Sequence, residues 1–490
     1  MTFVDKDLLS VQEARILMER AGEAAAAMAA FPQEKLDHIL EAMLKAAAGQ
    51  LDTLSRMSAQ ETGYGEAADK CRKDRFICGA LAEQLRGMRC VGCLEEDEKT
   101  GVAVVGVPMG VVLALCPAAG PVAAVVSAAA MAVKSGNAVV FAPHPRAERT
   151  VRRAAEILAE AACGAGLPDG AISCPGTVTG EGTLAMLAHP SVSLILDTGV
   201  PEYLEAAARS KKPVIFGGIV PCPVFIERSA DVARAVEDIL VSRSFDCGIM
   251  AAAEQYVVAD SAIAREARRE MQQRGAYFMS ATEEEALVQL LCIHGGGQDP
   301  ETVGKSAVWL AKRAGFEVPQ GTRVLVSEQR YISGENPYAR PLLCPVLVFY
   351  IENDWMRACE KCMELLAGDN RCHTLAIHCR DEAVIRQFAL KKPVGRILVN
   401  TPAAFGAAGA TTNLFPSVTL GAVNAGQGIT SDNVSPMNLV YLRRVARGVK
   451  HEPWKAETAG QPQEAPHTAA DREPDPAALL RLILDQLTAK

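Results

Sequence analysis

Short apolar segments alternate with helix-forming segments along the first half of the chain, and this alternation limits the folds open to it. The run Pro121–Lys134 is rich in Ala and Val and is predicted to be a helix that stops near Gly136. A buried strand is expected directly after it, at Ala138–Ala142. Further strands are expected within 100–115, 171–174 and 193–196, and further helices at 148–165 and 201–210. Strands that alternate with helices in this way predict a parallel sheet and an α/β fold.

The flanking regions fit the same class. Residues 8–50 are predicted to be helical, because an amphipathic pattern leads into an Ala-rich run. A helix at 231–242, a strand at 256–258 and further alternation to about residue 400 are expected. Residues 401–430 are rich in Gly, Ala, Thr and Asn and are predicted to be mostly loop.

Composition narrows the functional classes. The 490 residues are 49% hydrophobic and 22% charged, which is typical of a globular protein of two or three domains. A net charge of −8 offers no basic footprint for nucleic acid. The first 23 residues show no signal-peptide pattern, and three prolines interrupt the most apolar stretch, Val102–Val133. We therefore expect a cytoplasmic protein without a membrane span.

The fifteen cysteines are expected to be free thiols in a reducing compartment. Two Cys-x-x-Cys pairs occur, Cys90/Cys93 and Cys359/Cys362, and Cys372-His373 follows the second pair. Zinc sites of this kind need a second ligand pair at suitable spacing. The preferred interpretation is buried thiols that pack as small hydrophobes, with no metal.

The last forty residues differ in composition from the rest. Residues 451–474 are rich in Pro, Gln, Glu, Thr and Ala and are predicted to be a flexible linker. Asp475 can cap a helix that begins at Pro476. Four apolar residues of 475–490 then fall at i, i+3, i+4 and i+7 on one helical face: Leu480, Ile483, Leu484 and Leu487. A helix this short is marginal alone and needs a partner surface, either on another protein or on its own oligomer.

Several motifs occur in order along residues 5–448. They are Gly110-Val111-Val112, Phe141-Ala142-Pro143-His144-Pro145-Arg146-Ala147, Ala251-Ala252-Ala253-Glu254-Gln255, Pro345-Val346-Leu347, Gly395-Arg396-Ile397-Leu398-Val399-Asn400-Thr401-Pro402 and Ser431-Asp432-Asn433-Val434. With them the chain resembles the CoA-acylating aldehyde dehydrogenases, the acetaldehyde and propionaldehyde dehydrogenases that make acyl-CoA. The Pro-His-Pro run and the Gly-Arg-Ile-Leu-Val-Asn-Thr-Pro run look specific to this branch.

The resemblance implies two domains with parallel sheets and a bridging segment that makes oligomers. A dinucleotide-binding domain is expected over 1–228 with a return segment at 420–448, and a catalytic domain over 229–419. The implied cofactors are NAD and CoA. In such enzymes a cysteine thiolate attacks the aldehyde, hydride passes to NAD, and CoA releases the acyl group from a thioester.

At the catalytic positions that the resemblance assigns, this chain departs from the family. Ala251 stands where the nucleophilic cysteine is expected, in the run that begins at Asp246. Gly120 stands where an asparagine would stabilise the oxyanion. Cys247 lies four residues before Ala251 and is the candidate substitute thiol, although a misplacement of about 1 Å already costs roughly 10²-fold in rate. Glu254 matches a family glutamate and is expected to be structural.

The cofactor side shows similar departures. Pro341 replaces a glutamate that would contact the nicotinamide ribose, and Val200 follows the glycine turn near the pyrophosphate. The family's Gly-Pro-Gly-Asn loop is reduced to Gly217-Gly218. We therefore expect weak NAD binding. The candidate cofactor-binding residues are His144, Pro145, Thr198, Gly199, Gly218 and Pro341.

Three functions remain open at this point. The first is an inactive paralog that acts as a scaffold or joins an active aldehyde dehydrogenase, as a homo-oligomer or hetero-oligomer. The second is an active NAD-dependent acylating enzyme with another nucleophile, and the third is a nucleotide- or CoA-binding sensor. Residues 451–490 resemble the encapsulation peptides of relatives in bacterial microcompartments, which favours a place inside such a compartment and a shell or cargo protein as partner of 475–490.

Overall fold

The computed structural model describes residues 5–218, 220–292, 297–333, 336–367, 372–422 and 428–450, together with Arg481. The predicted linker 451–474 and the predicted helix 475–490 lie outside the described residues, apart from Arg481.

A five-stranded parallel sheet forms the first layered region, in the order β5-β4-β3-β6-β7. Its strands are β3 (Val111–Cys116), β4 (Ala138–Pro143), β5 (Ile172–Ser173), β6 (Val192–Asp197) and β7 (Val214–Phe216). Every residue of β3 and β4 is buried, as expected for parallel strands covered on both faces. The predicted parallel sheet and α/β class are confirmed.

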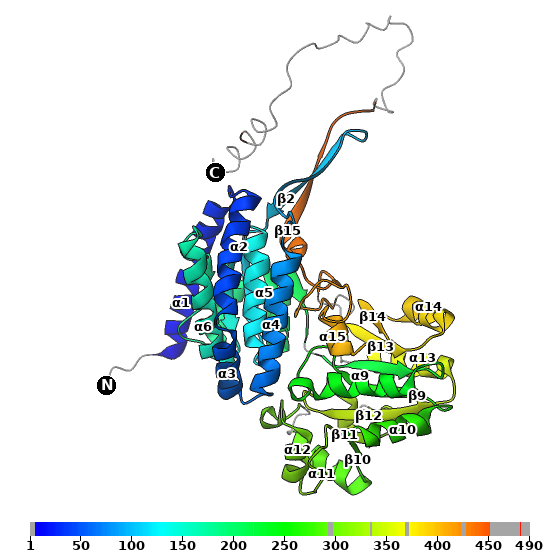
Figure 1. Cartoon of the computed structure of the whole chain (residues 1–490). Coiled ribbons are helices and arrows are strands. Elements are labelled where there is room, and N and C mark those ends of the chain that lie inside the picture. Colours follow the sequence, from blue (N-terminus) through cyan, green and yellow to red (C-terminus); the bar gives the residue numbers. More distant parts are fainter. Residues whose placement is uncertain are drawn as a thin grey trace, which may run out of the picture. The chain divides into compact units, whose positions relative to one another are not determined.

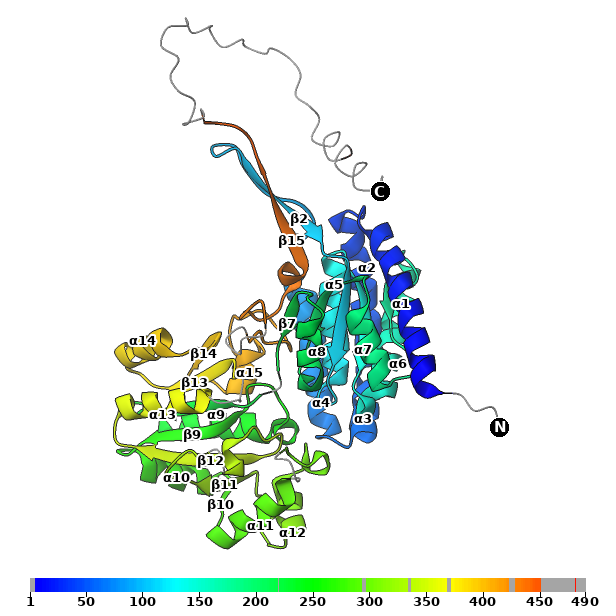
Figure 2. The same cartoon turned by 180° about the vertical axis from the view of Figure 1, so that it is seen from behind.

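Helices cover both faces of this sheet. They are α1 (Lys6–Met28), α2 (Gln33–Ala48), α3 (Leu51–Thr62), α4 (Ala67–Gln84), α5 (Pro121–Lys134), α6 (Glu148–Gly164), α7 (Gly180–Ala188) and α8 (Leu204–Arg209). Helices α2 to α6 lie on one face (Figure 1), and α1, α7 and α8 lie on the other (Figure 2). The predicted helical span 8–50 is two helices, because the chain turns before α2 at Pro32, which cannot continue a helix.

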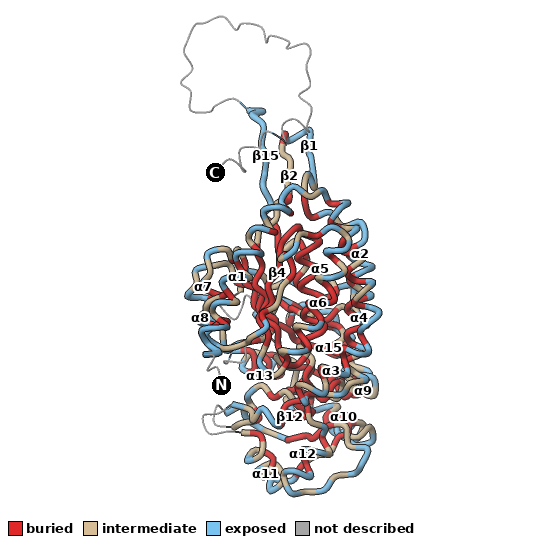
Figure 3. Tube along the Cα trace, turned by 90° about the vertical axis from the view of Figure 1, so that its left-hand side faces the viewer, coloured by how far each residue is buried: buried red, intermediate tan, exposed pale blue. Residues whose placement is uncertain are grey.

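Helix α5 is the centre of the first region. All of its residues from Pro121 to Lys134 are buried, which agrees with a sequence that is apolar all round (Figure 3). Its bounds match the prediction, and Gly136 with φ +74 ends it in the left-handed conformation that glycine adopts without strain.

The second region is built on a seven-stranded parallel sheet in the order β10-β11-β12-β9-β8-β13-β14. The strands are β8 (Cys222–Ile226), β9 (Glu254–Asp260), β10 (Ala276–Phe278), β11 (Val324–Glu328), β12 (Val346–Glu352), β13 (Thr374–His378) and β14 (Arg396–Val399). The helices are α9 (Val232–Ser244), α10 (Ala264–Gln273), α11 (Ala281–Leu291), α12 (Ala307–Ala314), α13 (Trp355–Ala367), α14 (Glu382–Lys391) and α15 (Ala403–Ala407).

The change from the first sheet to the second falls between Phe216 and Cys222, ahead of the boundary expected after residue 228. Strand β8 pairs with β9 and β13, so its residues belong with the second sheet. Short 3-10 helices connect several elements: η1 (Pro145–Ala147), η2 (Pro201–Tyr203), η3 (Phe245–Gly248), η4 (Pro300–Thr302), η5 (Pro337–Ala339) and η7 (Pro436–Leu439).

A third sheet has the order β1-β2-β15, with β1 (Gly92–Asp97), β2 (Val102–Pro108) and β15 (Val440–Ala446). Ala422, Val434 and Leu439 pack in the core of the first region, whereas β15 belongs to this third sheet. The expected return segment 420–448 is therefore divided: its first part packs in the core of the first region, and β15 belongs to the third sheet. By contacts, one compact unit holds both large sheets, and the other holds 93–106 with 442–450 of the described chain.

Candidate active site

A cavity of about 40 Å³ lies at the carboxyl end of β3, where the chain passes through Pro117 and Gly120 into α5. Strand β3 has β4 on one side and β6 on the other, so the strand order reverses at this point. In open α/β sheets, such a reversal is where ligands bind. The lining residues are Lys73, Pro117, Ala119, Gly120, Ala123, Thr198, Ile249, Met250, Ala251, Ala404, Ala408, Ser417, Val418 and Leu420.

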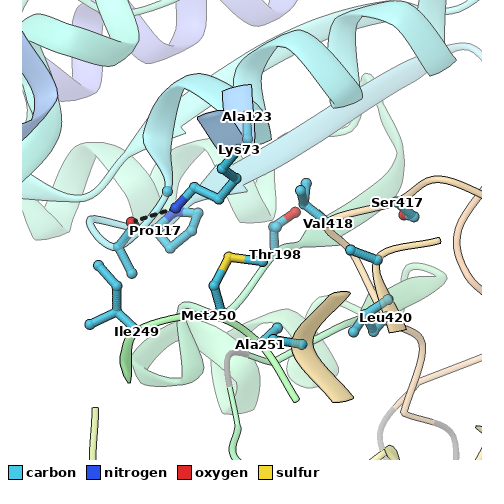
Figure 4. A pocket seen from close by; sticks show the side chains of 14 residues that line it. Lys73, Pro117, Ala123, Thr198, Ile249, Met250, Ala251, Ser417, Val418 and Leu420 are labelled. Carbon is cyan, nitrogen blue, oxygen red and sulfur yellow. Dashed lines mark hydrogen bonds between the residues drawn. The ribbon is translucent and has the colours of Figure 1, made fainter. Parts of the chain in front are cut away.

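Gly120 and Ala251, the positions at which the resemblance places an asparagine and a cysteine, both line this cavity. Gly120 lies on the β3–α5 connection and Ala251 on the loop that follows η3, so each comes from a different sheet region. Figure 4 shows Lys73 and Ala251 reaching the cavity from different sides. Among the described lining residues there is no thiol, no side-chain amide and no carboxylate. The lining therefore lacks the thiol and the side-chain amide that the resemblance leads one to expect at positions 251 and 120.

The loop before Ala251 is held in an uncommon backbone conformation. Asp246 and Cys247 have φ +49 and +53, and Gly248 follows with φ +78. A left-handed conformation in non-glycine residues costs energy and persists when the surroundings fix it. A Cβ on Gly248 would lie 2.7 Å from the backbone of Cys344, so the loop packs directly on the strand connection beneath it.

A buried ion cluster fixes the same loop to α4. The Asp246 carboxylate accepts hydrogen bonds from Lys73 Nζ at 2.8 Å and from Lys70 Nζ at 3.2 Å. Its second oxygen accepts from the Glu66 N–H at 3.0 Å. Burial raises the pKa of Asp246, but the two lysines outweigh burial and hold that pKa below its usual value. The carboxylate is therefore charged and fully partnered.

Lys73 occupies the space next to the missing oxyanion donor. A Cβ on Gly120 would lie 3.3 Å from Lys73 Nζ. Burial lowers the pKa of Lys73, but the charges of Asp246 and Asp74 raise it above its ordinary value. The cavity thus contains an ammonium group that is committed to Asp246, in place of a neutral amide that could bind an oxyanion.

Cys247 does not line the cavity, and only 6% of its surface is exposed. Burial, together with the charges of Glu66 and Asp246, raises the pKa of its thiol to about 12. A thiol with this pKa is protonated at neutral pH, and the thiolate is the nucleophilic form. The geometry gives no support to Cys247 as the substitute nucleophile.

Glu254 lies at the start of β9 and also does not line the cavity. Its Oε1 accepts a hydrogen bond from the Ala403 N–H at 2.7 Å, and its Oε2 is buried without a partner. Burial raises the pKa of Glu254 to about 8, although the Ala403 N–H and the Ser242 hydroxyl oppose the shift. The bond from the Ala403 N–H joins the start of β9 to the start of α15.

Four of the candidate cofactor residues follow the carboxyl ends of β4 and β6, the two strands that flank β3. His144 and Pro145 come after β4, and Thr198 and Gly199 come after β6. Of these four, only Thr198 lines the cavity. His144 Nδ1 accepts from the Arg146 N–H at 3.0 Å, and burial lowers the pKa of the His144 ring. His144 therefore caps η1 in this structure.

In the turn expected near the pyrophosphate, the backbone N–H groups already donate to a side chain of the protein. The N–H groups of Gly199 and Val200 both donate to Asp197 Oδ1, at 2.9 and 2.7 Å. A dinucleotide pyrophosphate is normally held by such free backbone N–H groups. In this conformation the turn offers neither N–H group to a pyrophosphate, and the weak NAD binding expected from the sequence stays a prediction.

Gly218 and Pro341 are not among the residues that line the cavity. The Gly218 carbonyl is 2.9 Å from His373 Nε2, which places it beside the second sheet. Pro341 precedes Leu342, whose N–H donates to Gln255 Oε1 at 2.8 Å.

Among the described residues, no group of His, Cys, Asp and Glu is arranged to hold a metal ion. No described helix combines the length and apolar character that crossing a bilayer requires.

Sequence reasoning did not identify Lys73 or the stretch Ser417–Leu420 as part of the site. Lys70 and Lys73 are three residues apart on a helix with other charges, so nothing in the pattern separates these buried lysines from exposed ones. The 417–420 stretch lies in a region that the sequence marks only as loop.

A family model described as the aldehyde dehydrogenase family matches residues 5–285. The chain therefore belongs to the aldehyde dehydrogenase family. Its relatives place it with the CoA-acylating members. The Escherichia coli bifunctional aldehyde-alcohol dehydrogenase AdhE is 33% identical over 450 residues, covering 91% of this chain and 50% of that protein. The chain thus spans about half the length of the curated relatives it matches first.

Solved structures agree in fold along most of the chain. A probable aldehyde dehydrogenase from Listeria monocytogenes is 40% identical with a TM-score of 0.88, covering 91% of this chain and 99% of that one. An acetylating aldehyde dehydrogenase from Geobacillus thermoglucosidasius is 37% identical with a TM-score of 0.89, covering 92% and 100%. A propionaldehyde dehydrogenase from the fucose-utilisation microcompartment of Clostridium phytofermentans is 26% identical with a TM-score of 0.79, covering 88% and 96%.

Proposed function

We propose that this chain is a catalytically inactive paralog of the acylating aldehyde dehydrogenases, acting as a scaffold or as a partner in an oligomer with an active enzyme. The observation that carries the proposal is the cavity at the carboxyl end of β3. Its described lining presents a methyl group at Ala251 and no side chain at Gly120. The acylating reaction passes through a thiohemiacetal and a thioester, so each step depends on a sulfur at this place.

The hydroxyl groups of the cavity do not offer a replacement for that sulfur. Thr198 Oγ1 is 2.8 Å from Thr419 Oγ1, and Ser417 Oγ donates to the Thr419 carbonyl at 3.0 Å. A hydroxyl becomes a nucleophile when a neighbouring base removes its proton. Lys73, the charged group in the described lining, is protonated and bound to Asp246, so it cannot act as that base.

The test is a turnover assay on the purified full chain with acetaldehyde or propionaldehyde, NAD and CoA. We expect no NADH formation above the rate without protein. Ala251→Cys alone is expected to stay far below family rates, because the missing oxyanion donor costs about 10²–10³ in rate. Turnover by the natural chain that disappears in Cys247→Ala would overturn the proposal in favour of an active enzyme. Micromolar NAD or CoA binding without turnover would favour a sensor.

We further propose that residues 451–490 tether the protein inside a bacterial microcompartment. Support comes from the Pro/Gln/Glu linker, the capped leucine stripe of 475–490 and the microcompartment origin of one similar enzyme. The test compares the full chain with a chain ending at Lys450, each fused to a fluorescent protein and expressed with a shell operon. Puncta with the full chain and diffuse signal with the short chain are expected. Diffuse signal from both would end the idea.

A further inference from the structure

Cys359 and Cys362 form the Cys-x-x-Cys pair on α13, and the structure gives the first of them an unusual neighbour. Lys392 Nζ lies 2.9 Å from Cys359 Sγ and donates to the Cys359 carbonyl at 2.6 Å. Lys392 follows the last residue of α14, so two separate elements meet at this contact. Cys359 and Lys392 are both buried, with 6% and 7% of their surfaces exposed.

The surroundings hold the amine and the thiol together. Lys392 Nζ also lies 4.7 Å from the centre of the Phe388 ring. Among the described residues, no carboxylate is within ion-pair distance of Lys392, and its hydrogen bonds go to the thiol and the carbonyl of Cys359. Cys359 borders a surface depression together with Trp355, Met356 and Lys391, which gives small molecules a path to the sulfur.

We propose that Cys359 and Lys392 form a modification site, in which oxidation joins the sulfur and the nitrogen through one bridging oxygen atom. A single oxygen fits between a sulfur and a nitrogen at this separation without movement of either element. A disulfide between Cys359 and Cys362 is the competing product, and it would show the loss of two hydrogens without any gain of oxygen, which would overturn the proposal.

The reaction balances with dioxygen as the oxidant. The ammonium of Lys392 first releases one proton to solvent. The S–H bond and one N–H bond then break, and an S–O bond and an N–O bond form. One atom of dioxygen becomes the bridge, and the other leaves as water with the thiol hydrogen and one amine hydrogen. Sulfur and nitrogen together supply the four electrons that dioxygen accepts.

The bridge would act as a covalent staple between α13 and the end of α14. A cross-link that closes a loop of this length stabilises a protein mainly by limiting the unfolded chain. Thiol reductants would reverse it, since sulfur at this oxidation level is still reducible. The site is separate from the cavity at Ala251 and does not depend on the function proposed for that cavity.

The test uses the full chain, prepared without oxygen under reductant and then equilibrated with air after the reductant is removed. Intact-mass measurement is expected to show the gain of one oxygen and the loss of two hydrogens, and peptide mapping a Cys359–Lys392 link that dithiothreitol removes. Lys392→Arg keeps the charge and is expected to lose the link. Cys362→Ser is the matched control on the same helix and is expected to keep it.

Thermal unfolding supplies the second measurement. The melting temperature of the air-equilibrated chain is expected to fall on addition of reductant, and that of Lys392→Arg to stay unchanged. An unchanged mass in air, a gain of oxygen alone, or the same product in Lys392→Arg would each overturn the proposal. If Lys392→Arg fails to fold, Cys359→Ser replaces it and is expected to show no cross-link in air. If Cys359→Ser still gains one oxygen and loses two hydrogens, the cross-link does not need Cys359 and the proposal is overturned.

Discussion

Asp246 holds two buried lysines and a backbone N–H with one carboxylate, on the loop that leads to Ala251. Removing one partner of a buried ion cluster leaves the others without compensation, which is more costly than losing the contact itself. The cluster therefore holds the loop that carries Ala251 against α4.

Asp246→Asn is expected to lower the free energy of unfolding by about 3–5 kcal/mol, because Lys70 and Lys73 keep their charges in a buried place. Asp52→Asn is the matched control, since Asp52 pairs with Arg75 at an exposed site, where an ion pair contributes about 1 kcal/mol or less. Urea unfolding of both variants measures the difference. Equal losses would show that Asp246 is not the centre of a stabilising cluster.

Glu254 makes stability depend on pH in the opposite sense to an ordinary salt-bridged carboxylate. Its pKa rises from 4.5 to about 8 on folding, so between these values the folded chain binds the proton more tightly than the unfolded chain. The contribution of the protonated Glu254 to the free energy of unfolding is complete below pH 4.5 and is lost as pH rises to about 8. The shift corresponds to at most about 5 kcal/mol.

Glu254→Gln is therefore expected to flatten the fall in unfolding free energy between about pH 5 and pH 8. The glutamine cannot ionise and keeps an oxygen for the Ala403 N–H. Denaturant titrations at several pH values measure the slope for each protein. Parallel slopes in the natural chain and the variant would contradict the prediction.

At the scale of elements, the connection between α3 and α4 allows a clean comparison of two glycines. Gly63 and Gly65 have the same φ of +67. A Cβ on Gly65 would lie 1.9 Å from Asp246 Oδ1, whereas a Cβ on Gly63 would have Lys305 Nζ as its nearest contact, at 3.6 Å. The two positions share a left-handed backbone conformation and differ in the atoms that an added side chain would contact.

Gly63→Ala is expected to cost roughly 1–2 kcal/mol from the left-handed backbone alone. Gly65→Ala is expected to cost clearly more, because the methyl group must also displace the Asp246 carboxylate from its lysines. Thermal unfolding of the two variants gives the comparison. A Gly65→Ala variant no less stable than Gly63→Ala would show that the connection moves aside freely.

The elements best predicted from sequence are those with uninterrupted apolar runs, such as Pro121–Lys134 and Ala138–Ala142. Helix α7 was missed, because it opens with Gly180 and Gly182, which favour turns. Strand β1 was missed as well, since Glu95, Glu96 and Asp97 give it no apolar pattern.

Ala251 and Gly120, singled out from the sequence, line one cavity. Lys73 could not be foreseen as part of it, because its partner Asp246 lies 173 residues away in the chain.

At the scale of the whole molecule, NAD is expected to leave the global stability almost unchanged. A ligand that binds the folded chain at about 100 times its dissociation constant stabilises it by about 2.7 kcal/mol. With Gly199 and Val200 bonded to Asp197 and proline at 341, millimolar NAD is expected to shift the melting temperature by less than about one degree. An active acylating relative is the positive control, and a similar shift in both proteins would contradict the expectation.

The short distance between Gly120 and Lys73 also bears on how such a chain can evolve. A side chain at 120 would bring its Cβ to 3.3 Å from Lys73 Nζ, so a return to asparagine there requires a small shift of the ammonium that pairs with Asp246. On the function proposed above, cysteine at 251 would not restore family rates without a donor at 120, and the donor would do nothing without the cysteine. Recovery of activity would then need at least two changes, neither of which brings a gain alone. An inactive descendant of an enzyme would for this reason stay inactive far more readily than it would regain the reaction.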